Sequence, residues 1–387
     1  MDERKRTREL IGEVLAELVE EVKGGCVKKV NIGLMSYGSE LGSGELLRGA
    51  SLAMQNDPSL NVVLIGPKCE GSERMACIET PACEADISKA MEDALQKGII
   101  SGAVALHYPF PLGVATIGKV LTPAKARPCF IASSTGTSSS NRAEAMVRNA
   151  IYGIAAAKAD GIVSPTVGIL NLDGAQTVFR ALHKLNEGGY PINFGSSMRK
   201  DGGAILRGND LLAGSVDVCV TDTLTGNVLM KLFSAWNTGG NYEALGWGYG
   251  PSAGEDWDRV VSIISRASGA PVIASALSLN ARCVKGGLPG LVAAELESAK
   301  KAGLADILSS IQPKQPSAEE DVKAPPAEPT DEEIHGIDVL EIEDAVKALW
   351  KEGIYAESSM GCTGPVIKMA ASRIEKAKAV LKENGYI

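Results

Sequence analysis

The sequence is poor in several features, and each shortage excludes a class of protein. It lacks any run of roughly 18 uncharged apolar residues, so we expect no membrane span. Basic residues are outnumbered, 39 Lys and Arg against 47 Asp and Glu, and a net charge of −8 argues against a nucleic-acid partner. Aromatic residues make up only 4% of the 387 residues, but 45% are hydrophobic, which is ample for a folded core.

Cysteine pairs with metal-ligand spacing are also lacking. Eight cysteines are scattered along the chain, and Cys69, Cys77 and Cys83 lie closest together. No CxxC pair or nearby histidine accompanies them, so we expect no metal site. The charged N-terminal residues lack the apolar core of a signal peptide, and we therefore expect a cytoplasmic protein with reduced thiols.

Nucleotide-binding motifs fail on inspection. Residues 42–47 read GSGELL, with leucine where a dinucleotide fingerprint needs glycine or alanine. Residues 113–119 imitate a P-loop, but Val120 replaces the Ser or Thr that would hold magnesium. We therefore expect no nucleotide cofactor.

The sequence does contain a regular alternation of short apolar runs and helical patterns. This alternation predicts an α/β fold, with a mostly parallel sheet and helices on both faces. Ligands of such sheets bind outside the carboxyl ends of the strands. The predicted strands are 30–34, 62–65, 103–106, 129–132, 167–170, 192–194 and 216–220, and the predicted helices are 45–55, 88–97, 142–158, 175–186 and 226–236.

The chain divides into four predicted segments. Residues 1–28 have the pattern of an amphipathic helix, and 29–311 form the α/β core. Residues 312–333 hold five prolines, many acids and almost nothing apolar, which predicts a solvated linker that spans about 25 Å as a random coil. Residues 334–387 form a compact C-terminal module, in which a second helix is predicted to start at Pro365.

The candidate nucleophile is Cys362, in the loop SSMGCTGP at 358–365. If a helix starts at Pro365, the positive end of its dipole lies next to the thiol and lowers the thiol pKa. Gly361 and Gly364 leave room beside the sulfur for a large acyl donor. The alternative is a small buried cysteine in a capping loop.

The second candidate loop follows the predicted strand 216–220 and holds Asp222, Thr225, Gly226 and Asn227. Small hydroxylated residues and glycine at the start of a helix expose backbone N–H groups, which suits a phosphate. Asp222 could hold a donor in place or accept a proton. The alternative is an ordinary helix cap with Asp and Thr as capping side chains.

Three further polar loops follow predicted strands and could assist phosphate binding. The hydroxyl-rich loop 133–141 follows strand 129–132, and the glycine loop 36–44 follows the first strand. For the Ser/Thr-rich loop 133–141, the alternative is a merely solvated turn. The candidate ligand-binding residues are Thr135, Gly136 and Thr137, Ser36 and Gly38, and Asn171 after strand 167–170.

Three of the four tryptophans gather between residues 233 and 257. An aromatic, glycine-spaced segment of this kind suits a surface that binds a partner, or a lid. The alternative is a compact loop folded over the core.

Residues 216–227, VDVCVTDTLTGN, resemble the signature of the phosphate acyltransferases of phospholipid synthesis. Residues 168–174 and 192–194 also stand in that family's order. The similarity covers about residues 29–305 and implies a fold related to isopropylmalate dehydrogenases and phosphotransacetylases. Those acyltransferases convert acyl carrier protein thioesters and phosphate into acyl phosphates.

Together with the linker and the SSMGCTGP module, the core resembles the alpha subunits of component C of glycine/sarcosine/betaine reductase complexes, which serve anaerobic amino-acid fermentation. The resemblance implies that an acetyl group held as a thioester, by motif on Cys362, is transferred to inorganic phosphate as substrate, with no cofactor. It also implies two partners in an oligomeric assembly: a ketoacyl-synthase-like beta subunit of component C, and a selenoprotein component A that carries a carboxymethyl group.

Two loops depart from the acyltransferase pattern. Residues 36–40 read SYGSE in place of a Gly-Gly-Asp loop, and 107–111 read HYPFP in place of a Gly/Asn/Thr loop. We therefore do not expect the long-chain and carrier-protein site of that family. Two rivals remain: a free-standing phosphate acyltransferase, and a non-catalytic scaffold subunit that recruits partners through its aromatic loop.

Overall fold

The computed structural model describes residues 29–199, 202–312, 322–338, 341–361 and 364–387. The predicted N-terminal helix at 1–28 and the candidate nucleophile Cys362 lie outside the described residues. No helix in the described ranges has both the length and the apolar character that crossing a membrane requires.

A single large sheet runs through the core, in the order β3-β2-β1-β4-β12-β11-β5-β6-β10-β7-β8, with β9 paired to β7. Most neighbours are parallel; β5 runs antiparallel to β6 and β11, and β11 antiparallel to β12. The predicted α/β fold with a mostly parallel sheet is confirmed. The strands are β1 (Val30–Met35), β2 (Leu60–Gly66), β3 (Ala76–Glu79), β4 (Gly102–Ala105), β5 (Val114–Leu121), β6 (Pro128–Thr137), β7 (Thr166–Leu170), β8 (Asn193–Phe194), β9 (Ile205–Leu206), β10 (Val218–Val220), β11 (Gly250–Gly254) and β12 (Val261–Ile263).

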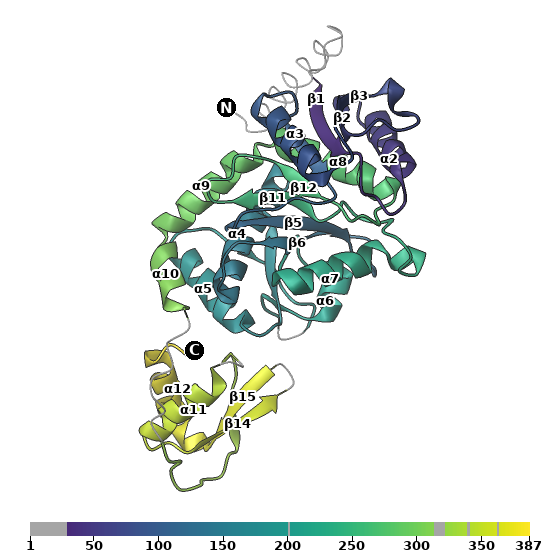
Figure 1. The fold of residues 1–387 in the computed structure, drawn as a ribbon. Helices are drawn as coiled ribbons and strands as arrows, with labels where there is room; N and C mark the ends of the chain where they lie inside the picture. Colours follow the sequence, from purple (N-terminus) through teal and green to yellow (C-terminus); the bar gives the residue numbers. More distant parts are fainter. Residues whose placement is uncertain (1–28, 200–201, 313–321, 339–340, 362–363) are drawn as a thin grey trace, which may run out of the picture.

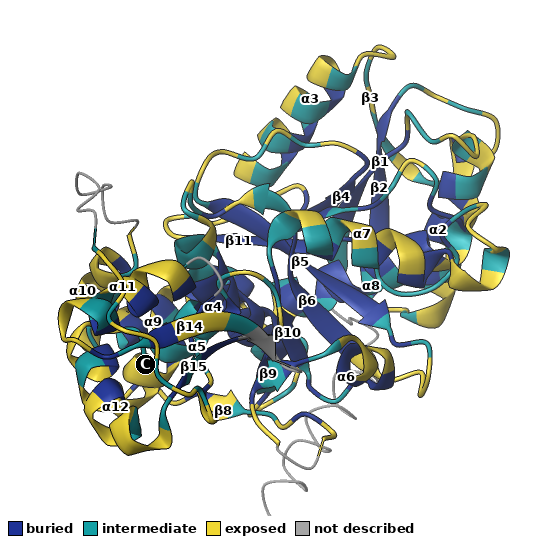
Figure 2. Cartoon of the chain, turned by 90° about the horizontal axis from the view of Figure 1, so that it is seen from below, coloured by how far each residue is buried: buried dark blue, intermediate teal, exposed yellow. Residues whose placement is uncertain are grey.

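Helices cover both faces of this sheet, because alternate side chains of each strand point to opposite faces. Val218 and Val220 of β10 pack in one cluster with α4, whereas Cys219 packs in another with Met230 and Phe233 of α7. Figure 2 shows the strands buried and the helices exposed on their outer sides. The core helices are α2 (Ser43–Asn56), α3 (Glu84–Gln96), α4 (Arg142–Ala159), α5 (Ala175–Glu187), α6 (Gly208–Ala213), α7 (Thr223–Ser234), α8 (Ala270–Lys285), α9 (Leu288–Lys301) and α10 (Leu304–Ser310), with 3₁₀ turns at Ser72–Arg74 and Trp236–Thr238.

Strand β11 joins two halves of the core. The first half packs α2 and α8 on β1, β2 and β4, and the second packs α4, α5 and α7 on β5, β6, β7 and β10. Gly250 and Pro251 of β11 pair with β12, while the rest of the strand pairs with β5. A Cβ at Gly250, whose φ is +81°, would stand 1.6 Å from the carbonyl oxygen of Ile117, so only glycine fits this junction.

The aromatic segment 233–257 is therefore not one loop, since it contains the end of α7, a 3₁₀ turn and β11. Trp247 and Trp257 are partly buried against the two halves of the core. Trp236 alone of the three is largely exposed. Trp247 and Trp257 therefore pack on the core, as the alternative of a compact segment predicted. Trp236 lies at the surface.

The C-terminal unit has its own small core around a three-stranded sheet in the order β13-β15-β14. It contains β13 (Glu332–Ile334), α11 (Ile342–Lys351), β14 (Ala356–Gly361), β15 (Gly364–Met369), a 3₁₀ turn at Ala371–Arg373 and α12 (Ile374–Glu383). The predicted helix start at Pro365 is wrong. Pro365 belongs to β15, in which Val366, Ile367 and Met369 are buried, and the helix begins only at Ile374.

The C-terminal unit lies against α5 of the core (Figure 1). Arg180 of α5 makes an ion pair with Glu341 at 2.8 Å and donates hydrogen bonds to the backbone oxygens of Gly336, at 3.3 Å, and Tyr386. Thr177, one turn earlier, donates to Asp338 at 3.4 Å. These contacts keep the module on the side of the core where α5 follows β7.

Candidate functional site

The second half of β6 and the start of α7 meet in a network of short polar contacts. Ser133 and Thr223 share a hydrogen bond of 2.8 Å between their hydroxyls, and Asn227 donates its side-chain amide to the backbone oxygen of Ser134 at 3.0 Å. Asp222 caps α7 by accepting from the backbone N–H of Thr225 at 3.1 Å and from its hydroxyl at 2.7 Å. The predicted alternative of a capping role for Asp222 is thereby confirmed, and its catalytic role stays a prediction.

Gly226 sets how closely α7 approaches β6. A Cβ at this position would stand 1.8 Å from the backbone oxygen of Ser133. Real Cβ atoms do not approach an oxygen so closely, so the first turn of the helix rests directly on the strand. The N–H groups of that turn are thus held at the end of the sheet, where a ligand would bind.

Replacing Gly226 with alanine is expected to push α7 away from β6 and to lower the free energy of unfolding by about 3 kcal/mol. Urea denaturation of the purified variant measures this loss. Gly44→Ala is the matched control, because this helical glycine of α2 has nothing within 4 Å of an added Cβ. Equal stability of the two variants would contradict the close approach.

Arg142 is the site residue that the sequence pattern did not reveal. It is the first residue of α4, and its guanidinium lies 3.1 Å from the carboxylate of Asp222, 80 positions further along the chain. Its side chain remains 48% exposed, so the cation can also reach a ligand. One signal was available: a cation at a helix N-terminus opposes the helix dipole, so its presence there needs another reason.

The electrostatics of this junction favour a bound anion. Burial alone would raise the pKa of Asp222, but hydrogen bonds from Thr225 and the guanidinium of Arg142 bring the pKa below its ordinary value. Asp222 therefore stays ionised at neutral pH and holds Arg142 in place rather than donating a proton. The N-termini of α4 and α7 both lie at this junction, where Asn141 already caps the N–H of Glu144 and Asp222 that of Thr225.

Thr135, Gly136 and Thr137 do not form a loop, because β6 continues through them. Their backbones pair with Thr116, Ala115 and Val114 of β5, and this pairing extends the strand beyond its apolar run. They line one side of a cavity of about 380 Å³. Tyr108, Phe110, Pro111 and Leu112 line the other side.

The remaining predicted ligand residues follow other strands of the sheet. Asn171 follows β7, the strand next to β10, and its backbone N–H donates to Leu206 at 2.8 Å. Ser36 and Gly38 line a separate cavity of about 480 Å³ with Arg266. Five strands separate β1 from β10, or about 29 Å measured across a flat sheet, so the cavity at the end of β1 is a different place from the β6–α7 junction.

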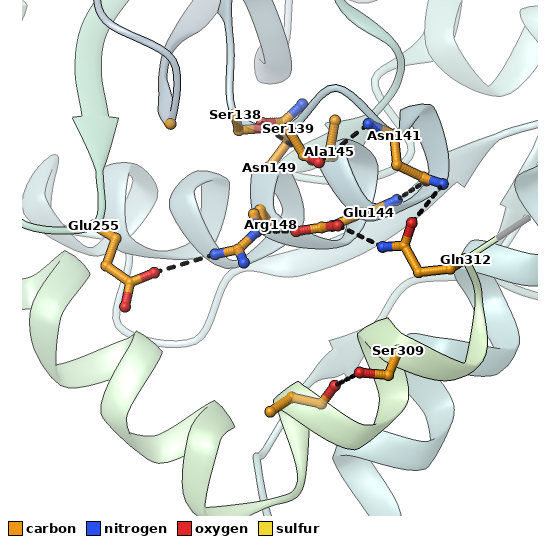
Figure 3. A network of polar contacts seen from close by, with 12 residues as sticks. Ser138, Ser139, Asn141, Glu144, Ala145, Arg148, Asn149, Glu255, Ser309 and Gln312 are labelled. Carbon is orange, nitrogen blue, oxygen red and sulfur yellow. Dashed lines mark hydrogen bonds and ion pairs between the residues drawn. The ribbon is translucent and has the colours of Figure 1, made fainter.

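The linker leaves the core beside Arg142. Gln312, the last described residue before the gap at 313–321, donates its side-chain amide to Glu144 at 2.8 Å and accepts from Asn141 at 3.5 Å. Asn141 is the cap residue of α4 and directly precedes Arg142. Figure 3 shows this network, which Arg148 extends to Glu255.

Fold and site together define a class of protein: an α/β core in which a helix with Thr-Gly-Asn in its first turns follows β10, and which carries an appended C-terminal module. The chain matches the family model described as "Fatty acid synthesis protein" over residues 30–368. It is 48% identical over 98% of its length, and 99% of the relative, to the glycine/sarcosine/betaine reductase complex component C subunit alpha of Peptoclostridium acidaminophilum. The chain belongs to the family of these component C alpha subunits.

Two more distant similarities concern the core. A phosphate acyltransferase of Phenylobacterium zucineum (strain HLK1) is 40% identical over 95 residues, which are 23% of this chain and 25% of that protein. A branched-chain phosphotransacylase of Enterococcus faecalis V583 aligns in structure with a TM-score of 0.46 and 13% identity, over 66% of this chain and 99% of that one.

Proposed function

We propose that this chain forms acetyl phosphate within a glycine/sarcosine/betaine reductase complex, by transferring an acetyl group from a thioester on Cys362 to inorganic phosphate. Family membership supports the place in component C and an acyltransferase core. The observation that carries the proposal is the pairing of Arg142 with Asp222 at the start of α7, beside the point where the linker leaves the core.

Inorganic phosphate is the second substrate, and the β6–α7 junction is its proposed site. The guanidinium of Arg142 supplies charge, and the first turn of α7 supplies N–H groups and the hydroxyl of Thr223. The site needs no nucleotide, since the bond energy of the thioester is kept in the acyl phosphate. No further cofactor enters the proposal.

In the transfer step, an oxygen of hydrogen phosphate attacks the thioester carbonyl carbon, and a C–O bond forms. The C–S bond then breaks, the electron pair leaves on the sulfur of Cys362, and the proton of hydrogen phosphate ends on that sulfur. The products are acetyl phosphate and the free thiol. N–H groups at the start of α7 stabilise the oxyanion that develops on the carbonyl oxygen.

The position of the linker explains how a distant module can serve this site. Because Gln312 is held on the first turn of α4, the segment that joins core and module starts next to Arg142. Once the module leaves its contacts with α5, the effective concentration of its thioester is highest around this anchor. The proposed partners complete the pathway of the acetyl group. A selenoprotein component A supplies the two-carbon group, and a ketoacyl-synthase-like beta subunit works with this chain.

Mass spectrometry of the full chain tests the proposal. Incubation with acetyl phosphate should add one acetyl group, about 42 Da, to the peptide that contains Cys362. Adding phosphate after removal of acetyl phosphate should discharge the adduct and release acetyl phosphate. A free-standing phosphate acyltransferase predicts turnover of acyl carrier protein thioesters with no adduct on this peptide. A scaffold subunit predicts neither adduct nor turnover, and either result would contradict the proposal.

A further inference from the structure

The C-terminal unit and the α/β core each have an apolar core of their own. The apolar cluster of the unit includes Ile337, Leu349 and Ile367, and in the described part of the chain it shares no member with the clusters of the α/β core. Domains joined by a small polar interface move relative to each other, whereas a large apolar interface holds them together. The unit can therefore leave α5 as a folded body, without exposing either apolar core.

Arg180 is the centre of the contact between the unit and α5. Its guanidinium pairs with Glu341 at 2.8 Å and donates to the backbone oxygens of Gly336 and Tyr386, so one side chain holds both an early and a late part of the unit. It also donates to the hydroxyl of Thr177 at 3.2 Å, which orients it from its own helix. The side chain of Glu341 is 38% exposed, so salt ions reach this ion pair and weaken it.

A detached unit stays close to its own core. Glu328 makes an ion pair with Arg373 at 3.2 Å, and Asp331 accepts a hydrogen bond from the backbone N–H of Ala371 at 2.8 Å, so both acidic residues belong to the unit. Gln312 is held on α4 of the core and stands 16 positions before Glu328. The chain between them spans at most about 55 Å, which keeps the detached unit within reach of the β6–α7 junction.

The contacts on α5 hold the body of the unit. They reach Gly336, Asp338, Glu341 and Tyr386, and the hairpin of β14 and β15 supplies none of these four residues. In addition, α5 packs with α4 on one face of the sheet, whereas α7, which begins at the candidate site, packs on the other. Docking on α5 is therefore fixed independently of the hairpin and on the side of the sheet opposite to α7.

We propose that Arg180 is a latch that keeps the C-terminal unit in a resting position on α5, and that the unit leaves this position as a folded body to bring its acetyl group to the β6–α7 junction. The acetyl transfer in this inference rests on the function proposed above, but the detachment does not. Arg180 is a positioning residue, because it sets the fraction of molecules in which the unit is docked and acts on none of the reacting atoms. Salt, or loss of the guanidinium, shifts this fraction toward the detached form.

Small-angle X-ray scattering of the full chain measures the detachment. Arg180→Ala should raise the radius of gyration at low salt by about 2 Å or more, because the unit moves away from the centre of mass. The original chain should expand in the same way when sodium chloride is raised from about 0.05 M to about 0.5 M, whereas the variant should change little. Lys184→Ala is the matched control, since Lys184 is exposed on α5 one turn after Arg180 and carries the same charge.

Arsenate-dependent hydrolysis of acetyl phosphate measures the consequence for acetyl transfer. Arg180→Ala should raise its rate about threefold or more, because a larger fraction of molecules holds the unit free. Glu341→Gln removes the ion pair from the other side of the contact and should give a smaller expansion and a smaller gain in rate. Combined with Arg180→Ala it should add little, because both substitutions break the same contact. Arg180→Lys restores the charge without the planar fork and should lie between the original chain and Arg180→Ala.

Two results would overturn the inference. If neither Arg180→Ala nor Glu341→Gln changes the scattering at low salt, Arg180 is not a latch. If both variants expand but hydrolyse acetyl phosphate more slowly than the original chain, the docked position is the productive one. Failure of the proposed function has a different signature: the original chain would show neither hydrolysis nor an acetyl adduct, while expansion of Arg180→Ala would still support the latch. Circular dichroism spectra identical to that of the original chain show that the variants are folded.

Discussion

Cys362→Ala is expected to abolish acetyl transfer, lowering the rate of arsenate-dependent hydrolysis of acetyl phosphate at least about 10³-fold. Arsenate replaces phosphate in the discharge step. The acetyl arsenate that forms hydrolyses at once, so the assay reports each turnover. Buried thiols of the core cannot take over this role. Burial raises the pKa of Cys129 and of Cys283 to about 12, and it raises the pKa of Cys219 well above the ordinary value of a thiol.

The control for this variant is Cys83→Ala. Cys83 is an exposed thiol of the core at the start of α3, and its side chain makes no capping hydrogen bond with that helix. This variant should keep full activity and still gain the acetyl group on the C-terminal peptide. If Cys362→Ala retained full arsenolysis, the acetyl group would have to be carried elsewhere, and the tethered module would have no role in the transfer.

The misread helix of the C-terminal unit changes how the thiol of Cys362 would be activated. Apolar residues at 366, 370, 374 and 377 fit a helical period, but the period runs across a strand and the helix that follows it. A strand with burial on both faces and a helix cannot be told apart over so few residues. Since Gly361 pairs with Gly364, β15 replaces the helix predicted to start at Pro365, and the dipole of that helix cannot lower the thiol pKa.

Parallel strands such as β1, β2 and β7 were predictable because each is largely buried and reads as a continuous apolar run, whereas the short parallel strands β3, β9 and β12 were missed. Strands β5 and β11 gave no such signal. Strand β11 has the sequence GPSAG and is a strand only because β5 and β12 pair with its backbone. Strand β5 contains Gly118 and Lys119, which imitate the end of a P-loop.

Lys119 shows why local sequence could not identify β5. A lysine is rarely buried, yet this one is enclosed between the rings of Trp247 and Phe130, at 4.6 and 5.0 Å from their centroids, and makes an ion pair with Asp160. Those partners come from three other parts of the chain. The information that makes the segment a buried strand is therefore tertiary.

The residues of the candidate site also differ in whether a local sequence pattern could identify them. Asp222, Thr225, Gly226 and Asn227 were found from the sequence because they follow one strand and open one helix, a local pattern. Arg142 belongs to another helix and joins them only through the pairing of β6 with β10. Conversely, a polar glycine loop after a strand is not enough to define the site. Ser36 and Gly38 have that pattern, but the strand order places them in another cavity.

Arg142→Gln is expected to raise the KM for phosphate about 30-fold, or about 2 kcal/mol of binding free energy, with a smaller effect on kcat. The substitution removes the cation and also leaves the carboxylate of Asp222 without its ion pair, so that the remaining charge repels phosphate. Steady-state arsenolysis and acetyl phosphate synthesis at varied arsenate or phosphate measure the change. Arg142→Lys should recover part of the affinity, because it restores the charge but not the planar fork of the guanidinium.

Arg148→Gln is the matched control for Arg142. It lies on the same helix and pairs with Glu144 at 2.8 Å and Glu255 at 3.2 Å, whereas the contact with Asp222 belongs to Arg142. Its KM for phosphate should stay within about twofold of the original value. If the two variants raised KM equally, the effect would come from the stability of α4. If Arg142→Gln left KM unchanged, phosphate would bind elsewhere, and the cavity beside Thr135 would be the next place to test.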